Sequence, residues 1–381
     1  MLRELTGKDQ LLADLIAGRG YPSIQDEPCP TADLVKAVRY HGIAGLLHER
    51  STGSEGPSSS FEEELRNIAL SQAMWELRHR AVLGRILEEF DDRGIRCLLL
   101  KGTALAYDLY DNPAQRARGD TDLLVEQCAL TEARRVFQRL GFQAESEEPG
   151  LPEVLRGQES WLCRADDGSV HSIDLHWRVL NAPALHGAFP FETLWSGRRA
   201  LTKLSRAAFA PARSILLAHA CVHRALHDCS PYYVGADVYF GGNRLIWLWD
   251  LLLLGRSLTP PEWEEVVELA KSGALGDVIV DGLMAAQARF GSFCPAHVQE
   301  RLRRAGPNRY FRRGQLGRAA MDWWAVRGPQ RKAQYALAKL LPSRQFMQAK
   351  YPSERDKPLP LLYLRRVREL IRHRPTGANA G

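Results

Sequence analysis

The feature of this sequence that most limits its possible folds is a change of hydrophobic period at Gly94. Before this glycine, apolar residues recur every three to four positions over 61–93, which predicts one long amphipathic helix. After it come short apolar runs, at Ile95–Leu100, Thr121–Val125, Ser160–Arg164 and Val170–Val179. Runs of this length predict strands, and the last two predict a hairpin around the turn at 166–168. The order predicts a small α/β sheet between helical flanks.

Helices are predicted on both sides of the sheet. Short helices are expected at 11–16 and 33–47, with a flexible serine-rich loop at 51–60. From Ser214 onward the pattern is helical, which predicts an all-α C-terminal half. We therefore divide the chain into an N-terminal helical segment (1–80), a catalytic core (81–205) and a helical C-terminal domain (206–381), basic towards its end.

Cysteine usage and hydropathy indicate where the protein works. The seven cysteines are scattered and include no Cys-x-x-Cys pair, which argues against a disulfide framework and a zinc knuckle. No apolar run reaches the roughly eighteen residues of a membrane span. Residues 1–10 carry charges of both signs and no apolar stretch, so we expect no secretory signal. These features predict a cytoplasmic protein without membrane contact.

Charge is distributed unevenly along the chain. Residues 301–381 contain 20 Lys and Arg but only 4 Asp and Glu, although the whole chain carries a net charge of only +6. The sequence therefore predicts an acidic body with a basic C-terminal part. Such a part is either a solvated helical surface or a region that attracts an anionic acceptor, and we favour the second interpretation.

The stretch 98–125 carries the most specific chemical pattern. A buried strand leads to Lys101, Gly102 and Thr103 at the start of a helix, where free N–H groups favour an anion such as a phosphate. Asp120 and Asp122 then lie two positions apart on a strand, so both carboxylates are expected on one face. Two carboxylates on one face suit Mg²⁺, which binds such groups together with substrate phosphates.

A third carboxylate is expected on a neighbouring strand. Asp174 stands between Ile173 and Leu175 in an otherwise apolar strand, where a charge needs a partner or a metal. Two-metal phosphoryl chemistry places one ion near the attacking oxygen and one near the leaving group. We expect Asp120 and Asp122 to bind both ions, and Asp174 to complete the ion at the acceptor hydroxyl.

This combination resembles the polymerase-β-like nucleotidyltransferase superfamily. The resemblance rests on Gly102-Thr103, on Asp120-x-Asp122 and on the single strand residue Asp174. At finer detail, Arg118 to Val125 and Asp174 to Trp177 are similar to uncharacterised nucleotidyltransferase family proteins often associated with bacterial biosynthetic gene clusters. Thr103 stands where the superfamily often has Ser. A longer gap before Asp120 implies that 111–117 loop out.

The resemblance implies an α+β fold, a minimal nucleotidyltransferase mixed sheet with helical flanks. It implies a Mg²⁺-dependent enzyme (two ions, Mn²⁺ possible) that uses a nucleoside triphosphate, expected to be ATP. The acceptor is left open between a small-molecule or peptide natural product and, for a toxin-like enzyme, RNA or protein. A nucleotide-sugar donor and an inactive relative that serves as a binding module are further alternatives, though three retained carboxylates argue against the latter.

Several side chains near this pattern have two interpretations. Lys101 either holds the triphosphate with Gly102 and Thr103 or pairs with a surface carboxylate. Arg118 either orients the strand of Asp120 and Asp122, touches phosphate or forms a structural ion pair. His176 either supports the metal site or the acceptor or is an ordinary buried histidine. His219, His223 and His227 share one helical face; zinc binding, contact with nucleotide or acceptor, and plain packing all remain open. Asp250, in an apolar helix, is expected to cap or pair locally.

Overall fold

The computed structural model describes most of the chain, and its elements follow the predicted order. The described residues are 7–19, 31–51, 60–145, 156–165, 167–228, 232–234, 237–239, 241–342, 344, 347–348, 351, 354 and 356–372. Most of the predicted serine-rich loop, 52–59, lies outside them. None of the described helices combines the length and the apolar character needed to cross a membrane.

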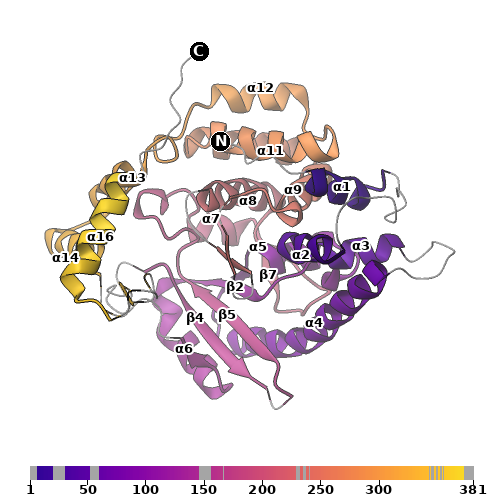
Figure 1. Ribbon diagram of the computed structural model, residues 1–381, viewed down its shortest axis with the longest axis horizontal. Helices are drawn as coiled ribbons and strands as arrows, with labels where there is room; N and C mark the ends of the chain where they lie inside the picture. Colours follow the sequence, from indigo (N-terminus) through magenta and orange to yellow (C-terminus); the bar gives the residue numbers. More distant parts are fainter. Residues whose placement is uncertain are drawn as a thin grey trace.

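A five-stranded mixed sheet forms the centre of the molecule (Figure 1). Its strands are β1 (Cys97–Leu99), β2 (Asp120–Val125), β3 (Gln143–Ala144), β4 (Gln158–Arg164) and β5 (Val170–His176), in the order β1-β2-β5-β4-β3. β2 and β5 pair in parallel, and the other pairs are antiparallel. The helices α5 (Lys101–Leu109) and α6 (Leu130–Arg139) follow β1 and β2. The four predicted strands are confirmed, whereas β3 was not predicted.

The helices before the sheet are α1 (Gly7–Ile16), α2 (Thr31–His41), α3 (Ala44–Ser51) and α4 (Ser60–Asp92). The single helix expected over 33–47 is broken, because Gly42 adopts a left-handed φ of 69° that favours glycine and ends α2. α4 is the predicted long amphipathic helix. It buries Phe61, Leu65, Leu83 and Phe90 against the core and runs along the lower side of the sheet in Figure 1.

The C-terminal half adds a helical layer above the sheet (Figure 1). Its helices are α7 (Phe191–Ser196), α8 (Arg213–His227), α9 (Leu245–Ser257), α10 (Pro260–Ser272), α11 (Gly276–Phe290) and α12 (Ala296–Arg304). Two short hairpins, β6 (Arg199–Ala200) with β7 (Phe209–Ala210) and β8 (Tyr232–Val234) with β9 (Asp237–Tyr239), were not predicted. One hydrophobic core runs continuously from Leu12 to Tyr310 and joins this layer to the sheet. The predicted α+β class, with a mixed sheet and a helical C-terminal part, is confirmed.

The segment expected to loop out, 111–117, packs against the helices with Ala114 and Arg116 buried, whereas Asp111 and Asn112 are exposed. It forms the 3₁₀ helix η2 (Pro113–Gln115), and a Cβ at Gly45 of α3 would come within 2.8 Å of the Gln115 backbone. Arg116 Nη2 donates to Asp250 Oδ2 of α9 over 2.7 Å, and the Tyr110 hydroxyl donates to the same carboxylate. The expectation that Asp250 pairs locally is therefore wrong. This buried ion pair connects the segment before β2 of the central sheet to the helical layer.

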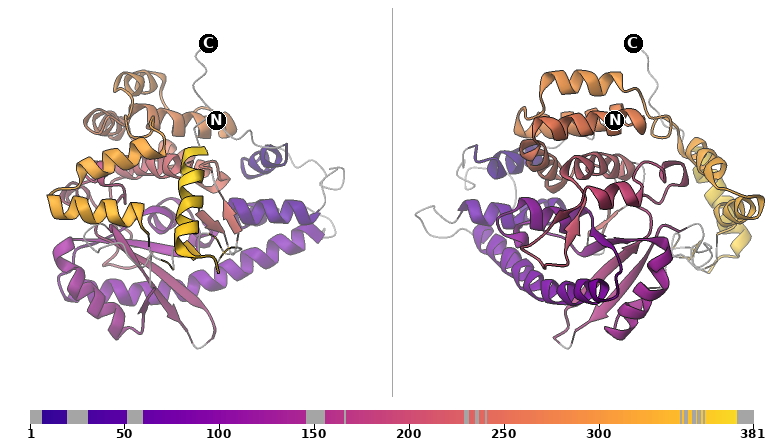
Figure 2. Two further views of the ribbon diagram at one scale, coloured as in Figure 1. Left: turned by 60° about the vertical axis from the view of Figure 1, so that its left-hand side comes forward. Right: turned by 180° about the vertical axis from the view of Figure 1, so that it is seen from behind.

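The last described helices form a separate C-terminal arm, α13 (Gln315–Ala325), α14 (Pro329–Leu340) and α16 (Leu359–Arg372). The views of Figures 1 and 2 place these helices together at one side of the molecule. Their two small apolar clusters are not part of the main core. A buried contact docks the arm, because Asp322 accepts a hydrogen bond from the Ala184 N–H of the 3₁₀ helix η5 (Pro183–Leu185) over 3.0 Å.

Candidate metal centre

The pairing of β2 with β5 brings three candidate ligands together. Asp122 lies directly beside Asp174 in the parallel register, and His176 follows two positions later. Ligand atoms of Asp122, Asp174 and His176 all lie within 4.8 Å of one another. His176 Nε2 is 2.8 Å from Asp122 Oδ1, and its Nδ1 is 3.2 Å from the Arg178 carbonyl oxygen. The arrangement is a candidate site for a divalent cation.

Asp122 is the most strongly held of the carboxylates. Lys101 Nζ donates to Asp122 Oδ1 over 2.5 Å. Burial alone would raise the pKa of Asp122, but the charge of Lys101 and the hydrogen bond from His176 outweigh it and hold that pKa well below its usual range. Lys101 has a left-handed φ of 47°, an uncommon conformation for a residue with a side chain. Lys101 thus pairs with a carboxylate in the structure, but with the buried Asp122 and not with a surface carboxylate. That Lys101 binds triphosphate stays a prediction.

Asp174 is oriented by the neighbouring strand β4. Ser160 Oγ donates to its Oδ1 over 2.6 Å, and Gln158 Nε2 donates to its Oδ2 over 3.1 Å. Asn181 Nδ2 in turn donates to Gln158 Oε1 over 2.9 Å. Ser160 and Gln158 were not singled out from the sequence. The two residues are two positions apart on a strand, so their side chains lie on one face. The expected hairpin could therefore have predicted that they share this face with Asp174.

Asp120 occupies the outer edge of the site. It begins β2, is exposed, and lies outside the tight group of three. Partial desolvation and the charges of Asp122 and Asp174 raise its pKa to about 6. The carboxylates of the predicted triad therefore act on one another electrostatically. That Asp120 binds metal stays a prediction.

Thr103 faces away from these carboxylates. Its hydroxyl is buried and lies 2.8 Å from the hydroxyl of Thr121, which is also 2.7 Å from His79 Nε2. His79 Nδ1 continues the network to His171 Nδ1 at 3.1 Å. Contrary to the expectation, the side chain of Thr103 is therefore part of an internal hydrogen-bond network and does not line the site. A Cβ on Gly102 would meet the Arg116 guanidinium at 3.4 Å, so an arginine approaches this glycine closely.

Arg118 forms an ion pair in the structure, and that it touches phosphate stays a prediction. Its Nη2 lies 2.6 Å from Glu76 Oε2 of α4, and the Tyr107 hydroxyl donates to the same carboxylate. A signal for Glu76 existed in the sequence, because it is an acidic residue on the buried face of an amphipathic helix. The pair fixes the chain immediately before Asp120.

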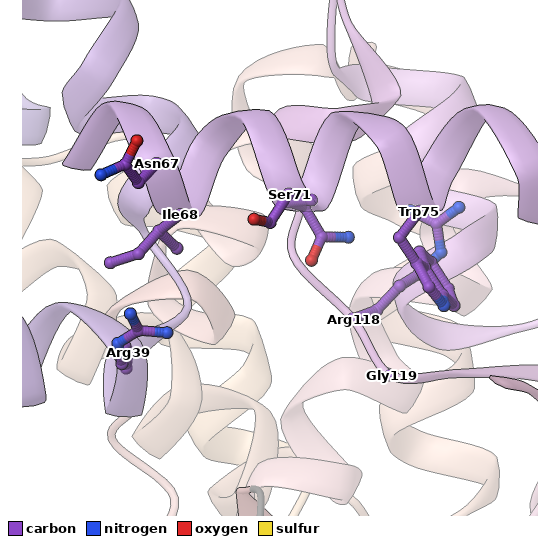
Figure 3. Close-up of a pocket in the computed structure, with 8 residues that line it drawn as sticks. Arg39, Asn67, Ile68, Ser71, Trp75, Arg118 and Gly119 are labelled. Atoms are coloured by element: carbon purple, nitrogen blue, oxygen red, sulfur yellow. The ribbon is translucent and has the colours of Figure 1, made fainter. Parts of the chain in front are cut away.

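A pocket of about 380 Å³ opens beside this ion pair, between α2 and α4 (Figure 3). Figure 3 shows Trp75 and Arg118 together at one end and Arg39 of α2 at the other, with Ser71 between them on α4. Gly119, the residue before Asp120, also lines the pocket. The pocket therefore reaches the start of the strand that carries the carboxylates.

The α8 histidines approach the site from the helical layer. His219 is only 3% exposed, and no hydrogen-bond partner for its Nε2 lies among the described residues. Burial and the charge of Lys101 lower its pKa to about 3, so the ring is neutral at pH 7. His223 Nε2 and His227 Nε2 are 3.1 Å apart. The structure places His219 within electrostatic reach of Lys101, Asp122 and His176, while the role of the three rings stays open.

Two comparisons with known proteins bear on this site. A family model described as "Uncharacterised nucleotidyltransferase" matches residues 30–291. The match covers the sheet, the three carboxylates and the helices α8 to α11, and it ends before the C-terminal arm. Among proteins of curated function, none matches the chain.

Proposed function

We propose that this chain, which belongs to the family of uncharacterised nucleotidyltransferases, is a nucleotidyl-transferring enzyme. It would move a nucleotidyl group from a nucleoside triphosphate to a hydroxyl or phosphate of an acceptor. Pyrophosphate is the other product. ATP is the proposed donor, and a small-molecule or peptide natural product is the proposed acceptor.

The observation that carries this proposal is the group of Asp122, Asp174 and His176, with Asp120 at its edge. The ligand atoms of Asp122, Asp174 and His176 are close enough for one cation to contact several of them after small side-chain movements. Carboxylates are the ligands that Mg²⁺ prefers. Three carboxylates share this site with a single lysine, so a cation would relieve their repulsion. A divalent cation bound there would stabilise charge on the transferred phosphate and lower the pKa of the acceptor hydroxyl.

His176 supports Mg²⁺ best as a hydrogen-bond donor that holds Asp122. Imidazole is a better ligand for softer cations, so direct coordination by His176 would favour Mn²⁺ over Mg²⁺. Comparing the two metals in His176→Gln would separate these roles.

Lys101 changes partner in this proposal. In the structure its ammonium pairs with Asp122. When a cation takes over as the partner of Asp122, Lys101 becomes available for the β- and γ-phosphates of the donor, together with the N–H groups at the start of α5. Pairing with Asp122 and binding of triphosphate are then two states of one side chain.

Asp174 is the proposed base. Ser160 and Gln158 fix its carboxylate from the β4 side, away from Lys101 and α5. A carboxylate held in this way is suited to orient the acceptor hydroxyl and to accept its proton. The donor and the acceptor therefore approach from opposite sides of β2.

The central experiment is incubation with each labelled nucleoside triphosphate and Mg²⁺, in parallel with nucleotide sugars. Mass spectrometry then identifies which of protein, RNA or small-molecule fractions gains the label. We expect transfer of a nucleoside monophosphate with release of pyrophosphate, and none with Asp122→Asn. Label in RNA or protein would favour the toxin-like alternative, and pyrophosphate release that is independent of Asp122 would refute the proposal.

The acceptor is proposed to be anionic, because the residues after 300 are strongly basic. Its affinity should then fall with salt, by roughly one log unit per log of salt for each phosphate contacted. Triphosphate affinity, which depends on the more buried metal centre, should change less. Equal and shallow slopes would indicate that the basic charge is only a solvated surface.

A further inference from the structure

A group of positively charged and hydrogen-bond-donating side chains lies just beyond the end of β5. Arg178 follows the metal-centre residue His176 by two positions, and its N–H donates to the Gly157 carbonyl over 3.1 Å. Its guanidinium reaches the loop after β5, where Nη1 contacts Nδ1 of His186. The two residues thus connect the metal-bearing strand to the loop of η5.

The chemistry of this contact fixes the proton on His186. A guanidinium has no acceptor atom, so Nδ1 must accept and the ring proton must lie on Nε2. That Nε2, like Nε of Arg178, is buried, and neither atom has a hydrogen-bond partner among the described residues. His186 also forms a hydrogen bond with the backbone of Asn181. The buried Nε–H of Arg178 has no acceptor among the described residues, which is costly unless a ligand accepts from it.

A third cation approaches from the C-terminal arm. Asp322 docks α13 against Ala184, two residues before His186. The arm thereby brings Arg331 of α14 near Arg178. Burial and the positive charge of Arg331 lower the pKa of Arg178, and burial and Arg178 lower the pKa of His186 to about 4. The charge of Arg331 is therefore within electrostatic reach of Arg178.

No carboxylate compensates these charges within the part of the chain that the structure describes. Every ion pair of an arginine with Asp or Glu there involves other residues than Arg178 and Arg331. Guanidinium groups within electrostatic reach of each other and without a counter-ion repel, and an added dianion would reduce that repulsion. Planar guanidinium forks also match the oxygens of a phosphate.

We propose that Arg178, His186 and Arg331 form a subsite that binds a phosphate group of the acceptor. The assignment to the acceptor rests on the proposed nucleotidyl transfer and on the sheet order. Lys101 and the start of α5 follow β1, on one side of β2, whereas Arg178 follows β5 on the other side. The loop after β5 is also tied through Asn181 and Gln158 to Asp174, the proposed base.

Inorganic phosphate is the probe for this subsite. Its dissociation constant is measured by calorimetry on the full chain, without metal or nucleotide, for the natural protein, Arg178→Met and Arg331→Glu. Arg327→Glu is the matched control, because it makes the same charge change at an exposed position of the same arm. We expect saturable phosphate binding that weakens about tenfold in Arg178→Met and Arg331→Glu and is unchanged in Arg327→Glu.

Thermal unfolding checks that the variants are folded. Arg331 is exposed, and Arg178→Met removes one of two repelling charges, so neither melting temperature should fall much. Absence of saturable phosphate binding, or equal weakening in Arg331→Glu and Arg327→Glu, would overturn the subsite.

A second binding experiment distinguishes an acceptor subsite from a donor subsite. With Mg²⁺ and a saturating non-hydrolysable ATP analogue present, phosphate should still bind with a similar dissociation constant. If the analogue abolishes phosphate binding, the group holds donor phosphates and the assignment to the acceptor is wrong. Asp122→Asn should lose transfer but keep phosphate binding, so failure of the proposed transfer and failure of the subsite give different results.

Discussion

Both faces of β2 carry polar side chains, but on only one face do these side chains have enough partners within the protein. On one face Thr121 takes part in a hydrogen-bond network with Thr103 and His79, which continues through His171 and Ser169 to Asp167. On the other face Asp120 and Asp122 share a site with Asp174, and Lys101 is their main counter-charge. Neighbouring residues of one strand therefore differ in whether other protein groups supply all their hydrogen-bond partners and counter-charges.

The difference separates a structural role from a functional one. A hydrogen-bond network whose donors and acceptors are paired within the protein needs no ligand, and it rigidifies the core. A crowded group of carboxylates keeps an electrostatic cost that a cation can remove, and sites that hold such a cost are candidates for function. If this comparison is correct, substitutions on the two faces must affect different measurements.

The largest effect is expected for Asp122→Asn. The variant loses a charged ligand, so the rate of pyrophosphate release should fall about a thousandfold, as when a main electrostatic element of an active site is removed. Its circular dichroism spectrum should match that of the natural protein. Near-normal turnover would remove the distinction between the faces, because the carboxylate face would then be dispensable.

The next effect is expected for Asp174→Asn. Because this carboxylate is proposed to act on the acceptor hydroxyl, kcat should fall about a hundredfold while triphosphate affinity remains nearly unchanged. Single-turnover kinetics and equilibrium binding of the triphosphate test the two parts separately. A collapse of triphosphate affinity would instead assign Asp174 to the donor side.

Thr121→Val should have the opposite profile. The substitution preserves shape but leaves His79 Nε2 and the Thr103 hydroxyl without their partner, which should reduce the free energy of unfolding by about 1–3 kcal/mol. Turnover below the melting temperature should change only a few-fold. Denaturant titration and initial rates measured on one preparation would show whether the loss is in stability, as we expect, or in activity.

The last prediction concerns the acid sensitivity of the face that carries Thr121. Burial, followed by the charge of Arg118, lowers the pKa of His79 from 6.5 to about 3. The unfolded chain therefore binds a proton that the folded protein does not, so this stability is complete above pH 6.5 and is lost as the pH falls towards 3. The slope from this one group is about 1.4 kcal/mol per pH unit. Unfolding of His79→Gln should depend less steeply on pH in that window, and an unchanged slope would contradict the buried, neutral state.

Several features of the fold and of the site follow from sequence periodicity alone. The boundary at Gly94, the long helix before it and the placement of Asp120 and Asp122 on one face are local consequences of a 3.6-residue and a 2-residue repeat. A small sheet and the helical C-terminal part could likewise be predicted, because each element carries its own pattern. That the sheet is mixed was implied by the family resemblance alone. The break at Gly42 was missed, because the helical pattern continues on both sides of that glycine.

What periodicity does not encode is which distant residues meet. The parallel register of β2 and β5 sets Asp174 beside Asp122, although 52 positions separate them along the chain. Tertiary packing also turned the Thr103 hydroxyl inward, and it paired Arg116 with Asp250 of α9. The sequence alone thus determined the types of side chain and the strand faces on which they lie. The tertiary structure decided their partners, because the pairing of buried charges depends on register and packing between elements that are remote in the chain.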